Sequence, residues 1–543
     1  MMYKRNMKNQ NQCKNIENHS LLRFVKGLRS TIIILTLAVG FGLNSCKDWL
    51  DLRPSGEVVL EEFWQSESDA ESVLAACYKS CTQTDYMDRV IVWGEARSDN
   101  LGSWNTYDPA LTRILENDIL PSNGFTAWGA FYRTINYCNT FLYFAPRVLE
   151  RDQNFSVGRL HSLESEVLTI RALTYFYLVR SFKEVPWISE ASVDDTQDYN
   201  VKKSTERAVL DSIISDLKYA KRYARINFEE DEIYNKGRIT LNAVRALLAD
   251  IYLWDGQYDL CVNECNDILA DDKLELVSGE ELLFQVFYRG NSTESIFELQ
   301  FDQNSRNIAV EDYYGVYPYL GQLSMPEFLA EGSSYSPFDY AAPGANESED
   351  DYRYKDFIRP LSGLFRIFKY PGAIRTENSE GNSTYSWRTS TPNWIVYRLA
   401  DVILMKAEAL VQLNRGENDL REALKMVNTT YLRANPDLGT DSLKFSYYSD
   451  TKAMEDLVLR ERHRELIFEG KRWYDLVRAA RRANSTAPVI ALISPKFTGS
   501  GGLEGDKLSL LDALYMPINA GELKANPELE QNEFYKTLTE GSN

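Results

Sequence analysis

The stretch from Leu241 to Ala270 constrains the fold of this 543-residue chain more than any other. Its apolar residues recur at helical spacing on both sides of Gly256, which predicts two helices joined by a tight turn. Small side chains stand where the two helices would touch, with Ala249 in the first and Cys261 in the second. The pattern therefore predicts a closely packed helix pair.

The spacing within this pair is that of a tetratricopeptide repeat, at Ala249, Tyr252, Gly256, Tyr258, Cys261, Cys265 and Ile268. Cys261 falls where that repeat usually has Ala, and Cys265 lies one turn later on the same inward face. Zinc binding is the alternative for cysteines at this spacing, but buried Cys behaves as a small apolar residue, so packing is favoured. Neither this pair nor Cys77 and Cys81 should form an internal disulfide. Cβ atoms at i and i+4 lie about 5–6 Å apart, whereas a disulfide needs about 3.8 Å.

Helical spacing dominates most of the remaining chain. A second helix pair is predicted at Arg398–Ala434, and single helices at Ser66–Gln83, Leu160–Phe182 and Ser204–Ala224. From about Val286 to Asn393 the chain is instead rich in Gly, Pro, Ser and Tyr, with short strand-like pieces. We therefore expect a mainly α fold, a tetratricopeptide-like scaffold of helix pairs in an α/α superhelix. Its loop-rich segment is of a kind that often carries function.

The first 45 residues predict a secretory signal. Seven basic residues and one acid, Glu17, accompany the apolar run Thr31–Leu43, which is too short for a membrane-spanning helix. The run ends in "LNSC", and Ser45 directly before Cys46 resembles the cleavage box of bacterial lipoproteins. The resemblance implies cleavage before Cys46 and acylation of Cys46, which would anchor the chain to a membrane. An uncleaved N-terminal anchor with a free Cys46 is the alternative.

The charge of the chain argues against nucleic acid and anionic lipid as partners. The net charge is −19, and removal of residues 1–45 would leave 53 Lys and Arg against 78 Asp and Glu, a net charge of −25. Such a surface repels phosphates. No other apolar run is long enough to cross a membrane. We therefore expect a soluble body, tethered by its first residue, that takes a neutral ligand.

The stretch Leu459–Arg478 concentrates charge, a histidine and a tryptophan within one helix length. A metal site or an acid/base pair is one interpretation of Glu461, His463, Glu465 and Glu469. At helical spacing, however, His463 falls on an apolar stripe with Leu459, Leu466, Gly470, Trp473 and Val477. A buried, hydrogen-bonded histidine is therefore favoured. Gly470 would permit a bend or a close approach, and Lys471 and Asp475 would form an ion pair on an exposed helix face.

No sequence motif supports an enzyme. The chain after residue 45 has two histidines, His161 and His463, and no H-E-x-x-H zinc site, G-x-S-x-G elbow or phosphate-binding glycine loop. Paired carboxylates for glycoside hydrolysis stay open, because their pairing is spatial. We predict a binding protein without catalytic residues, metal or cofactor.

The chain resembles the SusD/RagB family of surface glycan-binding lipoproteins in six blocks that stand in the family's order. They are "CKDWLDLRPSG" (46–56), "RSDN" (97–100), "IRALTYFYLVRSFKEVPWI" (170–188), "YRLADVILMKAEAL" (397–410), "ERHRELIFEGKRWYDLVR" (461–478) and "LYMPINAGELKANPELEQN" (514–532). The block that begins at Glu461 is the strongest signature. Lys47 and Asp48 also resemble the surface-export signal of these lipoproteins.

The resemblance implies capture of an oligosaccharide or polysaccharide at the cell surface and its delivery to a SusC-like TonB-dependent transporter. It implies a lipid-anchored position on the outer face of the outer membrane. The expected regions are a signal peptide (1–45), an N-terminal region (46–230), a tetratricopeptide-like pair (231–275) and a C-terminal region (286–543), the last three in one globular body. The same role with peptide cargo, or a protein-interaction scaffold, is the alternative, and a glycosidase is less favoured.

Binding of a neutral sugar needs flat aromatic faces and a few polar groups. Three loops offer them, and the candidate residues are Trp104, Asn105, Tyr107, Tyr313, Tyr314, Tyr317, Tyr319, Trp387 and Arg388. Core packing or loop anchoring is the alternative for each ring, because most of the 67 aromatic residues must be buried. The resemblance ranks Trp104 and the tyrosine run highest, because family members carry binding aromatics in these regions. Asn100, in the "RSDN" block, is expected to brace its loop.

Overall fold

The computed structural model describes residues 60–540 except 104–106, 194–198, 230, 316–320, 331–332, 339–350, 362, 378–382, 388–390, 439–441 and 498–506. Its contacts divide the chain into Met1–Phe63, which contains the short helix α2 (Leu60–Phe63), and Trp64–Asn543. Cys46 lies outside the described residues. Within the described part, no helix combines the length and the hydropathy that crossing a bilayer requires.

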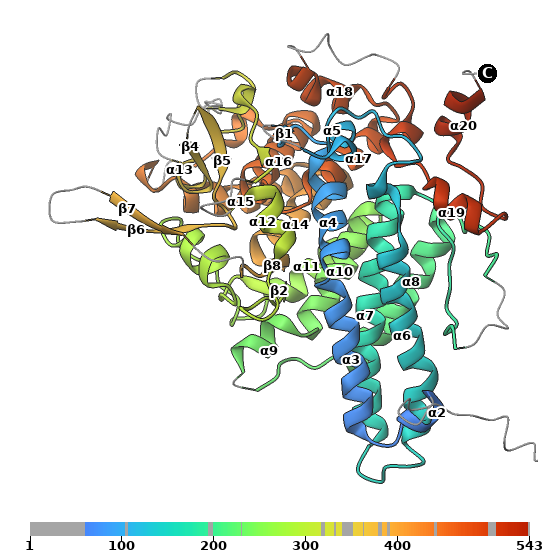
Figure 1. Cartoon of the computed structure of the whole chain (residues 1–543). Coiled ribbons are helices and arrows are strands. Elements are labelled where there is room, and N and C mark those ends of the chain that lie inside the picture. Colours follow the sequence, from blue (N-terminus) through green and yellow to red (C-terminus); the bar gives the residue numbers. More distant parts are fainter. Residues whose placement is uncertain are drawn as a thin grey trace, which may run out of the picture. The chain divides into compact units, whose positions relative to one another are not determined.

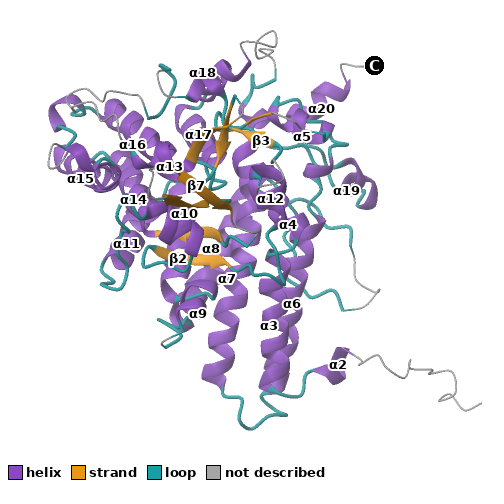
Figure 2. Ribbon diagram, turned by 60° about the vertical axis from the view of Figure 1, so that its left-hand side comes forward, coloured by secondary structure: helices purple, strands orange, loops and turns teal. Residues whose placement is uncertain are grey.

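Long helices from the first half of the second unit lie side by side (Figures 1 and 2). They are α3 (Glu67–Cys81), α6 (Gly129–Val148), α7 (Val157–Phe182) and α8 (Glu206–Tyr223). Three of them, α3, α7 and α8, begin at residues that cap helices well, Ser66, Ser156 and Thr205. The Ser156 hydroxyl accepts from the Arg159 N–H of α7, and Thr205 caps α8 in the same way. The helices α4 (Thr84–Ile91) and α5 (Pro109–Leu115) follow α3 in the chain.

The two predicted helix pairs are present. The first is α10 (Leu241–Trp254) with α11 (Tyr258–Leu269), and the second is α14 (Leu399–Leu413) with α15 (Glu417–Ala434). The pairs stack because α11 packs against both α10 and α14. Cys261 and Cys265 are fully buried free thiols in this stack, as the packing interpretation predicts. The fold is therefore mainly helical and built on tetratricopeptide-like pairs.

The loop-rich segment contributes most of the strands, which pair antiparallel in small sheets. The pairs are β1 (Gly102–Ser103) with β3 (Leu323–Ser324), β2 (Ser295–Leu299) with β8 (Trp394–Arg398), β4 (Ile358–Leu361) with β5 (Leu364–Ile367), and β6 (Ala373–Glu377) with β7 (Ser383–Trp387). Short helices interrupt the segment at α12 (Ile308–Tyr314) and α13 (Tyr352–Phe357), and α9 (Glu232–Gly237) precedes α10. The C-terminal part adds α16 (Thr451–Leu466), α17 (Arg472–Ala483), α18 (Ala487–Ile493), α19 (Ala520–Ala525) and α20 (Glu533–Glu540).

The signature block is two helices rather than the single one expected. α16 ends at Leu466 and α17 begins at Arg472, and the chain turns between them through positive φ at Phe468 (67°) and Gly470 (70°). Gly470 also meets Gly94 backbone to backbone. A Cβ added at Gly94 would lie 1.9 Å from the Gly470 carbonyl oxygen, so this crossing accepts no side chain there. Gly470 thus provides both the bend and the close approach.

The charges of the signature block are buried, and this corrects the expectation of an exposed helix face. The Arg398 guanidinium, at the end of β8, donates to Glu294 (2.6 Å), Glu465 (2.6 Å) and Glu469 (2.7 Å). All four side chains have no exposed surface. Lys471 pairs with Asp401 rather than with Asp475. Glu465 and Glu469 therefore join distant segments, while Glu461 with Arg464 and Asp475 with Arg478 also pair one turn apart.

Further cations surround the same carboxylates. Arg433 of α15 pairs with both Glu294 and Glu465. Lys369 donates to Glu469 (2.6 Å) and to the Glu465 carbonyl (2.9 Å), and burial lowers the pKa of its ammonium to about 8. The adjacent guanidinium groups hold the pKa of Glu465 well below its usual range despite its burial. This cluster, Arg398, Arg433 and Lys369 with Glu294, Glu465 and Glu469, is called the ion network below.

Replacing Arg398 with Met should destabilise the fold strongly, because three buried carboxylates would lose their shared partner. Breaking a buried ion pair on one side costs about 3–5 kcal/mol in the free energy of unfolding. Arg133→Met is a matched control, since Arg133 is half exposed and its pair with Asp85 should contribute about 0–1 kcal/mol. Denaturant titration of both variants measures the difference. Similar unfolding midpoints for the two variants would contradict the importance assigned to the network.

Candidate ligand-binding surface

Two of the three predicted aromatic loops start from one small sheet. In the β1–β3 pair, Gly102 lies opposite Ser324 and Ser103 lies opposite Leu323. The pair is antiparallel, so the chain that leaves β1 after Ser103 and the chain that enters β3 at Leu323 lie at the same end. The loop that contains Tyr107 therefore begins, at Ser103, beside the point where the segment after α12 enters β3, at Leu323.

The "RSDN" block, Arg97–Asn100, fixes the base of this surface. The Arg97 Nε donates to Asn117 Oδ1 at 2.9 Å, and its terminal nitrogens donate to the carbonyls of Ala513 and Leu514. Asp99 accepts two hydrogen bonds from the guanidinium of Arg472, at 2.8 and 2.9 Å. All of these block residues are buried. The block thus ties the start of β1 to α17 and to the C-terminal part of the chain.

Asn100 connects this block to the bend of the signature. Its Nδ2 donates to Glu95 Oε1 at 2.6 Å, and its Oδ1 accepts from His463 Nε2. Glu95 also accepts from the backbone N–H of Phe468 at 2.8 Å, and burial raises its pKa to about 7. Burial and the nearby Arg472 lower the pKa of His463 to about 3, so the imidazole is neutral at pH 7. The predictions of a bracing Asn100 and a hydrogen-bonded core histidine are confirmed.

Tyr107 is the exposed aromatic side chain of the first loop. Its side chain is 76% exposed, next to Asp108, which caps α5 by accepting from the Ala110 N–H at 2.8 Å. Trp104 and Asn105 lie outside the described residues. The loop therefore presents a ring to solvent from a position held on one side by β1 and on the other by a capped helix.

Tyr313 and Tyr314 differ from the expectation of solvent-facing loop rings, because α12 carries both into the core. The Tyr314 hydroxyl donates to the Phe468 carbonyl at 3.1 Å, and its ring stacks with Tyr370 at 6.2 Å between centroids. The Tyr313 hydroxyl bonds to the carboxylate of Asp88. In this structure both rings anchor the segment, which is the alternative given for them above. Tyr317 and Tyr319 lie outside the described residues.

The third loop belongs to the hairpin of β6 and β7. The backbone of Trp387 pairs with Ala373 at the base of this hairpin. Figure 1 shows the two strands extending away from the helices. The structure does not describe the side chain of Trp387, and Arg388 lies outside the described residues.

The acid cluster of the signature lacks the features of an acid/base or metal site. Glu461 accepts from Arg353 at 2.7 Å and from the Thr430 hydroxyl at 2.6 Å, without exposed surface. Glu465 and Glu469 are engaged in the ion network. The described part of the chain contains no group of three or more His, Cys, Asp or Glu placed to hold a metal.

Sequence reasoning missed a polar hollow beside α9. Its lining comes from separate stretches of chain between Ile226 and Ile296, namely 226–236, 240–242, 271–274 and 291–296. No motif marks it, because neither hydrophobic periodicity nor a regular spacing of polar residues links these stretches. The folded chain alone brings them together.

Two family models match the chain. The model described as the SusD family matches residues 361–535. The model described as starch-binding, associating with the outer membrane, matches residues 48–253. The two matches follow one another along the chain and include the signature block, the "RSDN" block and both helix pairs in whole or in part.

Among named relatives, "SusD-like protein P38" of Formosa agariphila is 25% identical and covers 93% of this chain and 98% of its own length. A "SusD-like protein" of Bacteroides ovatus is 26% identical, covering 82% and 81%. A SusD superfamily protein from Bacteroides vulgatus has a similar fold, with a TM-score of 0.67, 20% identity, and coverage of 87% of this chain and all of that one. NanU of B. fragilis has a TM-score of 0.63, 17% identity, and coverage of 89% and 99%.

The fold, the order of the matched segments and relatives that span nearly the whole chain agree with the resemblance found in the sequence, and the chain belongs to the SusD/RagB family.

Proposed function

We propose that this protein captures an oligosaccharide through the surface at the end of the β1–β3 sheet. The observation that carries the proposal is that two aromatic-rich loops start at the same end of one sheet, with Tyr107 exposed there. A flat ring exposed beside polar side chains is what the C–H faces and hydroxyls of a sugar require. Trp104, Asn105, Tyr317 and Tyr319 are proposed as further contacts on the same two loops.

The rigidity of the base supports this assignment. Arg97, Asp99 and Asn100 are buried and hydrogen-bonded, so the loop that bears Tyr107 starts from a fixed point. Preorganised binding groups lose less conformational entropy when a ligand binds. The family model that matches residues 48–253 is described as starch-binding, and glycan is the ligand class that fits both observations.

The proposal includes a partner and an anchor. Acylation of Cys46 after cleavage of residues 1–45 would hold the protein on the outer face of the outer membrane. Several acyl chains on one residue give stable anchoring, whereas a single chain gives marginal binding. From there the protein would pass its glycan to a SusC-like TonB-dependent transporter. Catalysis forms no part of the proposed role.

Calorimetric titration with a panel of neutral oligosaccharides tests the binding site. Tyr107→Ala and Trp104→Ala should each weaken binding about three- to tenfold, because an aromatic contact contributes roughly 0.5–1.5 kcal/mol. Tyr143→Ala is the matched control, since Tyr143 is an exposed tyrosine on α6. It should leave the affinity unchanged.

Two results would overturn the assignment of the site. One is glycan binding that neither loop variant weakens, which would place the site elsewhere. The other is an absence of glycan binding across the panel, combined with binding of peptides in the same assay, which would favour peptide cargo. A transporter complex with no ligand of either kind would favour a scaffold.

The anchor and the partner are tested by Cys46→Ser in cells. The wild-type protein should incorporate labelled fatty acid, fractionate with the outer membrane and co-purify with a TonB-dependent transporter. The variant should lose the label and leave the membrane fraction, because its apolar anchor would be absent. Membrane retention of an unlabelled wild-type protein would instead support the uncleaved anchor.

A further inference from the structure

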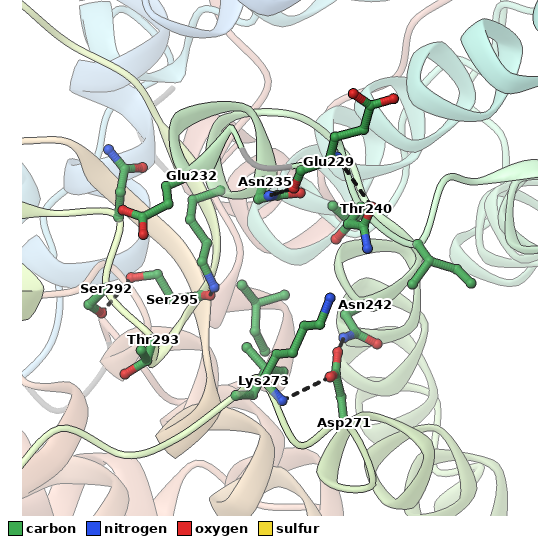
Figure 3. Close-up of a pocket in the computed structure, with 16 residues that line it drawn as sticks. Glu229, Glu232, Asn235, Thr240, Asn242, Asp271, Lys273, Ser292, Thr293 and Ser295 are labelled. Atoms are coloured by element: carbon green, nitrogen blue, oxygen red, sulfur yellow. Dashed lines mark hydrogen bonds between the residues drawn. The ribbon is translucent and has the colours of Figure 1, made fainter.

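The two loops of the proposed binding surface belong to stretches of sequence that contain acidic residues and no basic ones. Residues 98–112 contain two Asp, and residues 307–352 contain nine Asp or Glu, with no Lys or Arg in either stretch. Because Lys and Arg make up 60 of the 543 residues, their absence from 46 consecutive positions is unusual. The hollow beside α9, by contrast, has both signs of charge in its lining, with Glu232, Asp271 and Lys273 (Figure 3).

The structure places one of these acids on each loop. Asp108 follows Tyr107 directly and caps α5. Asp312 belongs to α12, and its carbonyl accepts from the backbone N–H of Gln322 at 2.9 Å, one residue before β3 begins at Leu323. Asp312 is therefore held at the end of the sheet from which the two loops start.

The buried hydroxyl of Tyr313 shows that these acids lie around one position. Burial raises the pKa of this hydroxyl most, and the negative charges of Asp88, Asp312 and Asp108 raise it further. The interaction between two charges weakens with distance and with screening by salt. Three carboxylates from α4, α12 and the loop of Tyr107 are therefore close enough to act on a single group at the base of the binding surface.

The basic side chains near this position offset only part of the negative charge. Arg89 acts on Asp88, and its guanidinium also donates to three backbone carbonyls. Arg306 is paired with Glu311. Among the described residues the Asp312 carboxylate forms no hydrogen bond or ion pair, and the charged group that raises its pKa is another acid, Glu311. Arg89 and the three acids around Tyr313 together carry a net charge of −2.

An exposed ring beside unneutralised carboxylates attracts an ammonium group. The face of a tyrosine binds a cation as well as the C–H face of a sugar, and Tyr107 is 76% exposed. A carboxylate forms a charge-assisted hydrogen bond with a protonated amine, which is stronger than its hydrogen bond to a hydroxyl. A uronate or a sulfate would instead be repelled.

We propose that the loop surface prefers glycans that carry positively charged amino groups, and that Asp108 and Asp312 are the residues that select them. This inference rests on the proposed function, because it assigns a ligand class to the same surface. The net charge of the whole chain predicts only that anions are disfavoured. The local acids add a preference for amino sugars over neutral sugars.

Calorimetric titration of the full lipoprotein tests the proposal with cellotetraose and with the tetramers of glucosamine and of glucuronate that have the same linkage. The probes share length and linkage and differ in charge. With the amine protonated and at low ionic strength, the glucosamine tetramer should bind about three- to tenfold more tightly than cellotetraose, as expected for one or two exposed ion pairs. The glucuronate tetramer should bind more weakly than both. Salt at about 0.15 M should reduce the preference, because the Debye length falls to about 8 Å.

The double variant Asp108→Asn and Asp312→Asn should remove the preference, so that the glucosamine tetramer and cellotetraose bind alike. Asn caps a helix as well as Asp does, so α5 keeps its N-cap. The matched control is Asp272→Asn with Glu280→Gln, which removes two negative charges from exposed residues outside both loops. It should leave the preference unchanged.

The proposal is overturned if the glucosamine tetramer binds the wild-type protein no more tightly than cellotetraose, which includes the case in which neither binds. It is also overturned if the preference survives in the Asp108 and Asp312 variant. Tighter binding of tetralysine than of the glucosamine tetramer would assign the acids to a basic peptide instead. The loop titration with neutral oligosaccharides and Tyr107→Ala does not depend on ligand charge, so failure here and failure of the proposed function are distinguishable.

Discussion

The contact between Arg398 and the carboxylates of Glu294, Glu465 and Glu469 holds the C-terminal half of the protein together. These residues come from the end of β8, the start of β2, the end of α16 and the bend after it. A charge without solvent must be paired. The four segments therefore cannot separate or slide past one another without leaving a charge unpaired in the core. This requirement fixes their relative positions more strictly than apolar contact alone would.

The consequence for function is a division between a buried, hydrogen-bonded interior and an exposed loop surface. The ion network fixes α16 and the bend at Phe468–Gly470. The bend accepts Gly94 and binds Glu95, and His463 of α16 bonds to Asn100. One residue beyond Leu101 the chain becomes β1 and then the exposed loop of Tyr107. Residues of the signature block thus support the base of the proposed binding surface.

Local patterns predicted the parts of the fold that are locally determined. The helix pair at Leu241–Ala270 follows from apolar spacing and Gly256, and it is present as α10 and α11. The prediction of a single helix across Leu459–Arg478 is wrong, because the chain turns at Phe468, which adopts positive φ. A positive φ is uncommon for residues other than Gly, so the sequence gives no sign of this turn at a Phe. The pairing of Glu465 with Arg398 escaped prediction for a related reason. The two residues are 67 positions apart, and only the packed fold makes them neighbours.

The candidate site shows the same limit. An aromatic residue in a Gly- and Pro-rich segment predicts a loop ring, yet Tyr314 is buried because Phe468 and Tyr370 offer it a carbonyl and a ring. Tyr107, by contrast, is 76% exposed. The β1–β3 register brings the loop of Tyr107 and the segment after α12 to the same end of one sheet. This register joins residues more than 200 positions apart, so local sequence patterns do not predict it. The hollow beside α9 is likewise a product of the folded chain.

The central claim is that a fixed interior carries a binding surface formed by two loops. Hydrogen–deuterium exchange with and without a bound oligosaccharide tests it most directly. Peptides that cover residues 101–108 and 310–324 should exchange more slowly with ligand, and those that cover α16 and α17 should exchange slowly and equally in both states. Ligand-dependent protection confined to residues 459–478, with no change in the two loops, would contradict this account.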